Sequence, residues 1–511
     1  MNEPIIEAIV QVFQWNVLLV IVIAAAYGLF MGAVPGLTAT MAVALLIPFT
    51  FFLDNTSALA AIVTLAACAI FSGDIPATLL RIPGTPSSAA YVDDAYAMTQ
   101  QGKPERALQV ALLFSVTGGL FGTLVLMTAA PWLARIAFQF TTYEYFWLMV
   151  MGLSCAVVVS RGPLSKGLLA LMAGLLLSTV GLSEVHGEPR FTFGRDELIA
   201  GVNFIPAMIG LFGMSELLRN AFRLGDPAWA SEEKLKASER GFAGVPSDAE
   251  QLPVLRLLWK RKGHVLRSSS IGSLVGMLPG AGADIGAWIS YGFSKRLSKR
   301  PEEYGRGSLE GIGDATSANN SSLAGAWIPA LVFGIPGDSI TAIVIGVLLM
   351  KNITPGPQIF NDPVQSVLLY SIFLTFLVAN LILIPLGLVA IRAGSLLVRI
   401  PRSFLLPVIL VFCVVGSYAI AGSYFDVGIM LAMGALGFAF ERNRIPLGPV
   451  VLGIILGGRL EQTFIQNLTK SDSLADFFSR PASAVLAAAC LLLWLTPFLL
   501  DRFSRTEKSG P

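Results

Sequence analysis

Long runs of apolar residues recur from one end of this chain to the other, and no other feature limits its fold as strongly. Three of them are Val17–Gly32, Leu168–Val180 and Ala484–Leu500. A helix that crosses a bilayer needs roughly 20 mainly apolar residues, and a sliding window finds on the order of a dozen such stretches. Only 13% of the 511 residues are charged, against roughly a quarter in a soluble domain. The sequence therefore predicts an all-α polytopic membrane protein with about 12 transmembrane segments.

The first apolar run is expected to remain in the protein as a membrane helix. A cleaved signal peptide would begin with a basic segment, whereas Glu3 and Glu7 precede this run and no Lys or Arg does. Lysines and arginines gather instead in residues 256–267, 295–300 and 502–508. By the positive-inside rule these three regions are expected in the cytoplasm and the N-terminus in the periplasm. We therefore expect a multi-pass protein of the bacterial inner membrane.

Several classes of function are excluded by the residues that the chain lacks. The formal net charge of +2 is too small to indicate nucleic-acid binding. Each of the four cysteines lies in an apolar run, and there are only two histidines, so neither a metal site nor another cofactor is expected. Residues 280–286 are rich in glycine but match no nucleotide-binding motif. An intramembrane enzyme would need a catalytic pair, and the acidic residues of the apolar segments stand alone, so the chain is not expected to be an enzyme.

One polar stretch, residues 220–267, divides the chain near its middle. It is charged, and it has too few apolar residues to form a core of its own. We therefore interpret it as a cytoplasmic linker between two membrane units. The predicted organisation is a first membrane repeat (1–219), the linker (220–267), a second membrane repeat (268–470), and a last transmembrane helix with a cytoplasmic tail (471–511).

Two motifs occur once in each half of the chain. Gly28-Leu-Phe-Met-Gly-Ala-Val-Pro-Gly36 and Gly272-Ser-Leu-Val-Gly-Met-Leu-Pro-Gly280 share the pattern G-x-x-x-G-x-x-P-G, 244 residues apart (272 − 28). Ile75–Gly84 and Ile328–Gly337 share I-P-A-x-x-x-x-I-P-G, 253 residues apart (328 − 75). Two matches in the same order with nearly the same offset indicate an internal duplication. The Gly-x-x-x-Gly parts can also serve only to let helices pack closely.

Each of these motifs ends in a Pro-Gly pair, which predicts a helix end or a break at membrane depth. Proline removes a backbone donor and clashes with the preceding turn, and glycine lets the chain leave helical geometry. Freed backbone groups inside a membrane need protein, water or a ligand as partners. Paired breaks in corresponding places of two halves are typical of the substrate site of secondary transporters, because half-helix N-termini suit anions and unwound carbonyls suit cations.

The candidate site residues are those at and beside the four breaks. For substrate binding we predict Pro35, Gly36, Thr38, Arg81, Pro83, Gly84, Thr85, Ser87, Pro279, Gly280, Asn319, Asn320, Pro336, Gly337 and Ser339. For coupling to a cation we predict Asp284, Asp314 and Asp338. Alternatives remain for both groups, because the breaks can be plain helix ends, the aspartates can cap the helices that follow them, and Arg81 can pair with Asp74 or Asp93 instead of a substrate.

The same motifs carry a resemblance to a known family. The sequence resembles the large membrane subunit of the tripartite tricarboxylate transporters (the TctA family) from about Gly28 to about Gly458. The resemblance rests on six segments: Gly32-Ala-Val-Pro-Gly-Leu-Thr38, Ile82-Pro-Gly-Thr-Pro86, Asp93-Asp-Ala-Tyr-Ala-Met98, Pro279-Gly-Ala-Gly-Ala-Asp284, Ala318-Asn-Asn320 and Ile328-Pro-Ala-Leu-Val-Phe-Gly-Ile-Pro-Gly337. Arg81, Asp94-Ala95 and Asp338 depart from the family pattern, which leaves the identity of the substrate open.

The resemblance implies a function, a fold and a set of partners. The chain would be the large permease subunit of a secondary transporter that imports tricarboxylates, dicarboxylates or aromatic acids, driven by a sodium or proton gradient. It would work with a small membrane subunit (TctB-like) and a periplasmic solute-binding protein (TctC-like). Its fold would be two inverted repeats with broken helices or re-entrant hairpins, arranged as in elevator-type carboxylate transporters. The alternative is a gradient-driven anion transporter or channel that acts without a binding protein.

Overall fold

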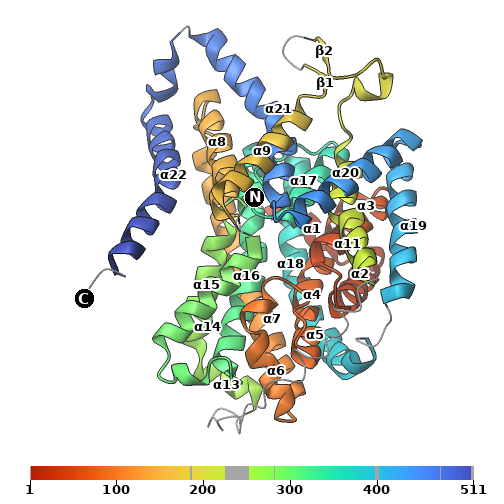
Figure 1. Cartoon of the computed structure of the whole chain (residues 1–511), viewed down its shortest axis with the longest axis vertical. Coiled ribbons are helices and arrows are strands. Elements are labelled where there is room, and N and C mark those ends of the chain that lie inside the picture. Colours follow the sequence, from red (N-terminus) through yellow and green to blue (C-terminus); the bar gives the residue numbers. More distant parts are fainter. Residues whose placement is uncertain are drawn as a thin grey trace.

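The computed structural model describes residues 2–160, 162–183, 187–224, 253–280, 282–397, 402–471 and 473–507 (Figure 1). The α-helices of the first half are α1 (Asn2–Val12), α2 (Trp15–Ala33), α3 (Ala39–Thr50), α4 (Asn55–Ser72), α5 (Asp74–Leu80), α6 (Val92–Gln100), α7 (Pro104–Ala137), α8 (Thr142–Val159), α9 (Leu164–Ser178), α10 (Phe204–Met208) and α11 (Ser215–Leu224). Those of the second half are α13 (Val254–Lys260), α14 (Lys262–Gly276), α15 (Gly282–Leu297), α16 (Leu309–Phe333), α17 (Ser339–Met350), α18 (Pro363–Leu397), α19 (Arg402–Ala421), α20 (Tyr424–Arg442), α21 (Leu447–Lys470) and α22 (Pro481–Glu507).

Short elements complete the described part of the chain. A π-helical turn, η3 (Ile209–Met214), joins α10 to α11. Five 3₁₀ turns lie at Ser88–Ala90 (η1), Asp196–Leu198 (η2), Pro301–Glu303 (η5), Pro357–Phe360 (η6) and Leu474–Phe478 (η7). Two-residue strands β1 (Gly181–Leu182) and β2 (Pro189–Arg190) pair in antiparallel fashion. The all-α fold class is therefore confirmed.

Six helical segments are long and apolar enough to cross a membrane, by length and composition. They are Trp15–Ala33, Asn55–Leu80, Pro104–Ala137, Thr142–Val159, Pro363–Gly394 and Tyr424–Arg442. Five shorter apolar helices accompany them within the described residues. The chain is thus a multi-pass membrane protein, while the count of 12 transmembrane segments stays a prediction.

Two helices, α4 and α16, form the centre of the molecule. In α4 every residue from Thr56 to Ser72 is buried, and most of these side chains are small and apolar, as expected for a helix surrounded by others. In α16 burial is almost as complete, yet the stretch Asp314–Ser322 is polar. Buried polar groups are normally hydrogen-bonded, and α16 therefore needs polar partners from the elements around it.

The repeated Gly-x-x-x-Gly motifs pack α2 onto α4 and α14 onto α16. A Cβ atom at Gly28 would lie 2.5 Å from the carbonyl oxygen of Leu65, and one at Gly272 would lie 2.1 Å from that of Ala318. These two partners are 253 residues apart (318 − 65), the offset already found for the second motif. The two motifs thus make the same backbone contact at corresponding places of the two halves, as close packing through small residues requires.

The long helices α7 and α18 each pack against the central helix of the other half. Both begin with a proline in the first turn, and they are 34 and 35 residues long. Helix α7 packs against α16 of the second half, and α18 packs against α4 of the first. Each half therefore completes the surroundings of the other half's central helix. The inverted relation of the two repeats and the elevator arrangement stay predictions.

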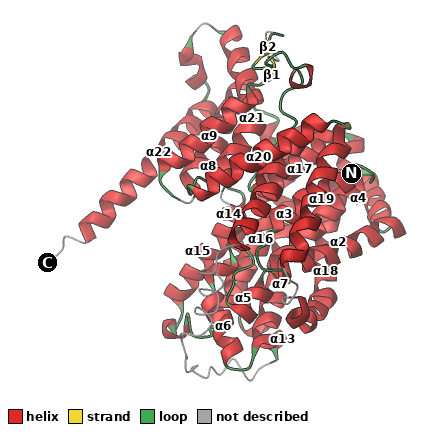
Figure 2. Cartoon of the chain, turned by 45° about the vertical axis from the view of Figure 1, so that its right-hand side comes forward, coloured by secondary structure: helices red, strands yellow, loops and turns green. Residues whose placement is uncertain are grey.

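Two further groups of helices lie beside this centre. Helices α8, α9, α21 and α22 pack together, and η3, α11, α19 and α20 form a second group that contacts α3. Figure 2 shows the end of α22 standing away from the other helices. Helices α11, α13 and α14 extend into both ends of the predicted linker, residues 220–267. The rest of that linker, residues 225–252, lies outside the described residues.

Candidate functional site

All four Pro-Gly pairs interrupt helices, as the sequence predicts. Pro35-Gly36 separates α2 from α3, and Pro279-Gly280 lies between α14 and α15. Pro83-Gly84 follows α5, and Pro336-Gly337 separates α16 from α17. Gly36 and Gly280 have φ angles of 91° and 77°, a region that favours glycine.

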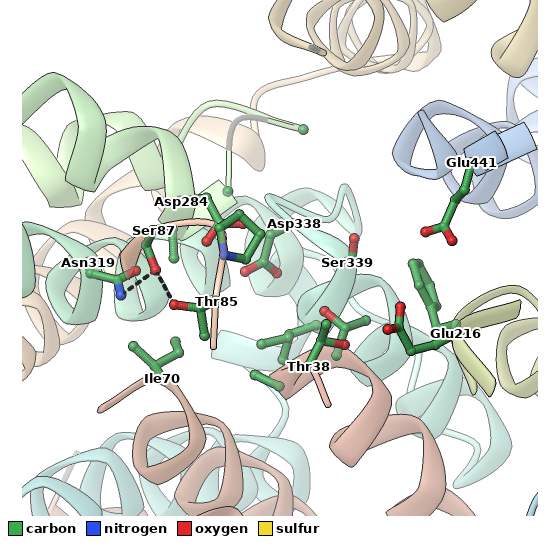
Figure 3. A pocket seen from close by; sticks show the side chains of 18 of the residues that line it. Thr38, Ile70, Thr85, Ser87, Glu216, Asp284, Asn319, Asp338, Ser339 and Glu441 are labelled. Carbon is green, nitrogen blue, oxygen red and sulfur yellow. Dashed lines mark hydrogen bonds between the residues drawn. The ribbon is translucent and has the colours of Figure 1, made fainter. Parts of the chain in front are cut away.

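A cavity of about 350 Å³ lies where these breaks meet (Figure 3). This volume is at the small end of the range for ligand sites, roughly 300–1,000 Å³. The lining includes eight of the predicted site residues, namely Thr38, Thr85, Ser87, Gly280, Asp284, Asn319, Asp338 and Ser339. They come from distant parts of the sequence, and the structure brings them together.

The second break is held to α16 by a chain of hydroxyl and amide groups. Thr85 and Ser87 hydrogen-bond through their hydroxyl oxygens at 2.8 Å, and the Asn319 side-chain amide donates to Ser87 Oγ at 2.8 Å (Figure 3). Ser88 closes the turn by donating from its hydroxyl to the carbonyl oxygen of Thr85 at 2.8 Å. Gly84 must remain a glycine here, because a Cβ would lie 2.6 Å from the carbonyl oxygen of Gly73.

The third and fourth breaks contact each other and aim helix N-termini at the cavity. The backbone N–H of Gly282 donates to the carbonyl oxygen of Gly337 at 3.3 Å. Asp338 caps α17 by accepting from the backbone N–H of Thr341 at 2.7 Å, so the capping alternative is confirmed for this residue. Asp284 lies in the first turn of α15. With Thr38 as the N-cap of α3, three helix N-termini border the cavity, where the helix dipole favours negative charge.

The opposite wall of the cavity comes from α11 and α20, and sequence reasoning missed it. It carries Glu216, Arg219 and Glu441. Arg219 forms an ion pair with Glu216 three residues earlier, and its Nη1 lies 3.6 Å from Glu441 Oε2. The available signal was a charged i, i+3 pair that directly follows the apolar run Phe204–Met214. The π-helical turn before α11 is a second signal visible only in the structure, since such turns are frequent at functional sites.

Ten of the predicted site residues do not line the cavity. Seven of them belong to the Pro-Gly breaks beside the cavity: Pro35, Gly36, Pro83, Gly84, Pro279, Pro336 and Gly337. Arg81 pairs with Asp93 at 2.6 Å, so the pairing alternative is confirmed for this side chain. Asn320 donates to the carbonyl oxygen of Ser115 and to Asn380 Oδ1, at 3.0 and 2.9 Å, and so ties α16 to α7 and α18.

Asp314 belongs to an ion-pair cluster where α14 meets α16. Its Oδ2 lies 2.6 Å from Arg267 Nη2 and 3.6 Å from His264 Nδ1. Glu310 lies 3.0 Å from Arg261 and 3.1 Å from His264. The His264, Glu310 and Asp314 ligand atoms lie within 4.8 Å of one another, close enough for a metal ion. The two guanidinium groups already neutralise both carboxylates, however, so this donor set fits ion pairs better than a metal ion.

Hydrogen bonds and nearby charges shift the ionisation of this cluster. Hydrogen bonds to Asp314 and Glu310 raise the pKa of His264 to about 9. Burial alone would raise the pKa of Glu310, but the hydrogen bond from His264 and the charge of Arg261 lower it to about 2. His264 and Glu310 are therefore both charged near neutral pH.

The four cysteines, which the sequence assigned to packing, are all buried and free. They lie at positions 68, 155, 413 and 490. Their burial agrees with that assignment.

A bundle of long apolar helices that encloses a polar, carboxylate-lined cavity at broken helices defines a class, the multi-pass membrane proteins that handle small polar solutes. A sequence model of the tripartite tricarboxylate transporter TctA family matches residues 18–452. The chain belongs to this family, which is a family of transporters and not of enzymes. The resemblance found in the sequence motifs is thereby confirmed.

Two relatives come from Agrobacterium vitis. The chain is 34% identical over 482 residues to a protein described as "Uncharacterized 52.8 kDa protein in TAR-I ttuC' 3'region", which covers 93% of this chain and 92% of that protein. It is 34% identical over 235 residues to an "Uncharacterized protein in TAR-II ttuC' 3'region", covering 45% of this chain and 96% of that protein. No solved structure matches.

Proposed function

We propose that this chain is the large permease subunit of a secondary transporter that imports carboxylates, and that a sodium or proton gradient drives it. The substrate would be a tricarboxylate, a dicarboxylate or an aromatic acid that binds in the cavity between the four breaks. The family membership supports the transport function. The chemistry of the cavity supports the carboxylate substrate and the coupling to a cation.

The observation that carries the proposal is the charge of the cavity lining. Among the described lining residues there are four carboxylates, Glu216, Asp284, Asp338 and Glu441, and one basic side chain, Arg219. With all five ionised, an anion entering alone would meet an excess of negative charge. Two like charges about 6 Å apart at an effective dielectric constant of about 20 repel by about 3 kcal/mol. A cation that enters with the carboxylate would offset this repulsion, which supports symport.

Asn319 supplies a second argument for a bound cation or donor. Its side chain is 2% exposed and lines the cavity, and its Oδ1 has no hydrogen-bond partner among the described residues. A buried carbonyl oxygen without a partner costs about 1–3 kcal/mol. A sodium ion, a protonated carboxyl group or a substrate hydroxyl beside Asn319 would remove this cost.

We further propose the partners and the location that the family implies. The chain would sit in the bacterial inner membrane with a small membrane subunit, and a periplasmic solute-binding protein would deliver the substrate. The competing proposal, a transporter or channel that acts alone, makes a different prediction. It expects full uptake in cells that lack the binding protein.

The test is uptake of labelled citrate, succinate and benzoate in cells that carry all three subunits. Sodium removal and a protonophore are applied separately and together. We expect uptake of at least one acid, and we expect it to stop when the coupling gradient is removed. Uptake that persists after both gradients are collapsed would contradict the coupling. Absence of uptake for every carboxylate would contradict the substrate class.

Two substitutions connect this test to the site. Thr85→Val removes a hydroxyl from the cavity wall, and Pro336→Ala removes the ring that restricts the backbone in the break between α16 and α17. Both are expected to lower uptake while the protein remains in the membrane. Normal uptake by both variants would show that the breaks end helices without forming the site.

A further inference from the structure

Arg219 is the one basic side chain among the described residues that line the cavity. Its side chain is 33% exposed, so it borders open space and is not enclosed in a core. A planar guanidinium matches a carboxylate with two parallel hydrogen bonds. A substrate carboxylate inside the cavity would find no other Lys or Arg within this lining.

In the structure Arg219 is held by two carboxylates of the protein itself. It pairs with Glu216 on its own helix and lies 3.6 Å from Glu441 of α20. Both glutamates also line the cavity (Figure 3). The carboxylates of Glu216 and Glu441 therefore contact the same guanidinium that an anionic substrate would need.

The two glutamates differ in how closely they contact Arg219. Glu216 is 6% exposed, and its Oε1 accepts from the Asn220 side-chain amide at 2.8 Å. Asn220 also donates to the carbonyl oxygen of Gly36 at 3.3 Å, which connects this wall to the first break. Glu441 is 26% exposed, and its distance from Arg219 is longer than that of a direct hydrogen bond. An incoming carboxylate would thus displace Glu441 more easily than Glu216.

We propose that Arg219 binds the substrate carboxylate and that Glu441 occupies it in the substrate-free state, so the substrate and Glu441 exchange on one guanidinium. This inference rests on the proposed function, since it requires an anionic substrate. Glu216 positions the guanidinium through its own ion pair and its bond to Asn220. Release of the substrate is assisted because Glu441 returns to Arg219 as the substrate leaves.

The experiment measures binding of citrate, succinate and benzoate to the purified full-length chain, co-purified with the small membrane subunit, in sodium-containing buffer. The variants are Arg219→Gln, Arg219→Lys and Glu441→Gln. The matched control is Arg135→Gln at the end of α7, whose side chain is exposed, has no hydrogen bond or ion pair within the described part of the chain, and does not line this cavity. Thermal unfolding of each variant reports its folding.

Arg219→Gln is expected to weaken binding roughly tenfold or more, because a charge-assisted pair is lost. Arg219→Lys should restore part of the affinity. Glu441→Gln should tighten binding about two- to fivefold, since a competing, partly exposed carboxylate is gone. Arg135→Gln should leave the affinity unchanged.

The sign of the Glu441→Gln effect separates the inference from a structural role. If Glu441 only braces Arg219, its loss lowers the affinity and the stability together, and the exchange is wrong. If Arg219→Gln fails to fold, the Glu441→Gln result still decides. Carboxylate binding by the unmodified chain that Arg219→Gln leaves unchanged would overturn this inference alone. An unmodified chain that binds no carboxylate would overturn the proposed function as well.

Discussion

Asn319 and Asn320 are neighbours in α16, and the structure gives their side chains different partners. Consecutive residues of an α-helix point about 100° apart around its axis. Asn319 therefore reaches the cavity and Ser87, while Asn320 reaches α7 and α18. The two asparagines offer a matched comparison of a cavity residue with a packing residue.

We expect Asn320→Ala to destabilise the protein and Asn319→Ala to impair transport. Asn320 is 1% exposed, and its loss leaves the buried Oδ1 of Asn380 and the carbonyl oxygen of Ser115 without this donor, which costs about 1–3 kcal/mol for each. Thermal unfolding in detergent and carboxylate uptake are measured for both variants. A larger fall in unfolding temperature for Asn319→Ala than for Asn320→Ala would contradict the assignment.

The charged cluster at the start of α14 predicts a pH dependence. His264 has a folded-state pKa of about 9 and an unfolded value near 6.5. Its contribution to stability is therefore complete below pH 6.5 and is lost as the pH rises to about 9. The Glu310 contribution is lost only as the pH falls from about 4.5 toward 2, so the two windows do not overlap.

The unfolding temperature of the protein should accordingly fall between pH 6.5 and 9. The corresponding loss in the free energy of unfolding is about 1 kcal/mol, because the His264 side chain is 37% exposed and solvent screens its ion pairs. Melting curves in detergent across this range measure the effect. His264→Gln should flatten the curve. A slope that His264→Gln leaves unchanged would assign the pH dependence to another group.

Close contact of α2 with α4 and of α14 with α16 depends on glycines, which have no side chain. A Cβ at Gly32 would lie 2.3 Å from the carbonyl oxygen of Ala69, and one at Gly276 would lie 2.2 Å from that of Ser322. A helix backbone cannot yield to such a contact without moving the whole element, so the glycines set the distance between these helices.

We expect Gly32→Ala and Gly276→Ala each to destabilise the protein by about 1–3 kcal/mol through overpacking. Gly292→Ala in α15 is the control, because no atom lies within 4 Å of the Cβ position there. It should be neutral or stabilising by up to about 1 kcal/mol, since alanine favours helix more than glycine does. Unfolding temperatures measure all three. Similar values for the three variants would contradict the packing argument.

The sequence predicted the elements better than it predicted their neighbours. All four helix breaks were found, because proline and glycine act on the backbone at their own positions. The Arg81–Asp93 pair was among the alternatives, since the two residues lie close in the sequence. The Arg219–Glu441 contact joins residues of the two halves, and no local pattern indicates it. The different partners of Asn319 and Asn320 likewise depend on which helices pack around α16.

Asp94 ties the first half of the chain to the second. Its Oδ1 accepts three backbone N–H groups, from Gly305, Gly307 and Ser308, at 2.7–3.0 Å. Its Oδ2 accepts the phenol of Tyr291 at 2.7 Å. Burial raises the pKa of Asp94, and these hydrogen bonds lower it in part. One carboxylate of α6 thus fixes the loop before α16.

Asp94→Ala is expected to destabilise the protein by about 3 kcal/mol or more, because four donors lose their acceptor. The neighbouring Asp93→Ala is the control. Asp93 is 54% exposed and its ion pair with Arg81 lies near the surface, so its loss should cost about 1 kcal/mol or less. The amount of folded protein recovered from membranes and its unfolding temperature measure both. Equal effects of the two substitutions would show that Asp94 does not join the halves.

The central helices α4 and α16 occupy corresponding places but differ in chemistry. If the two halves descend from one ancestral gene, the copies have since diverged in function. Helix α4 now serves mainly in packing, while α16 carries most of the amide and hydroxyl side chains. Evolution would then be free to exchange small apolar residues in α4 but constrained at each polar position of α16. A saturation mutagenesis screen for growth on a transported acid should recover many tolerated variants in α4 and few in residues 314–322.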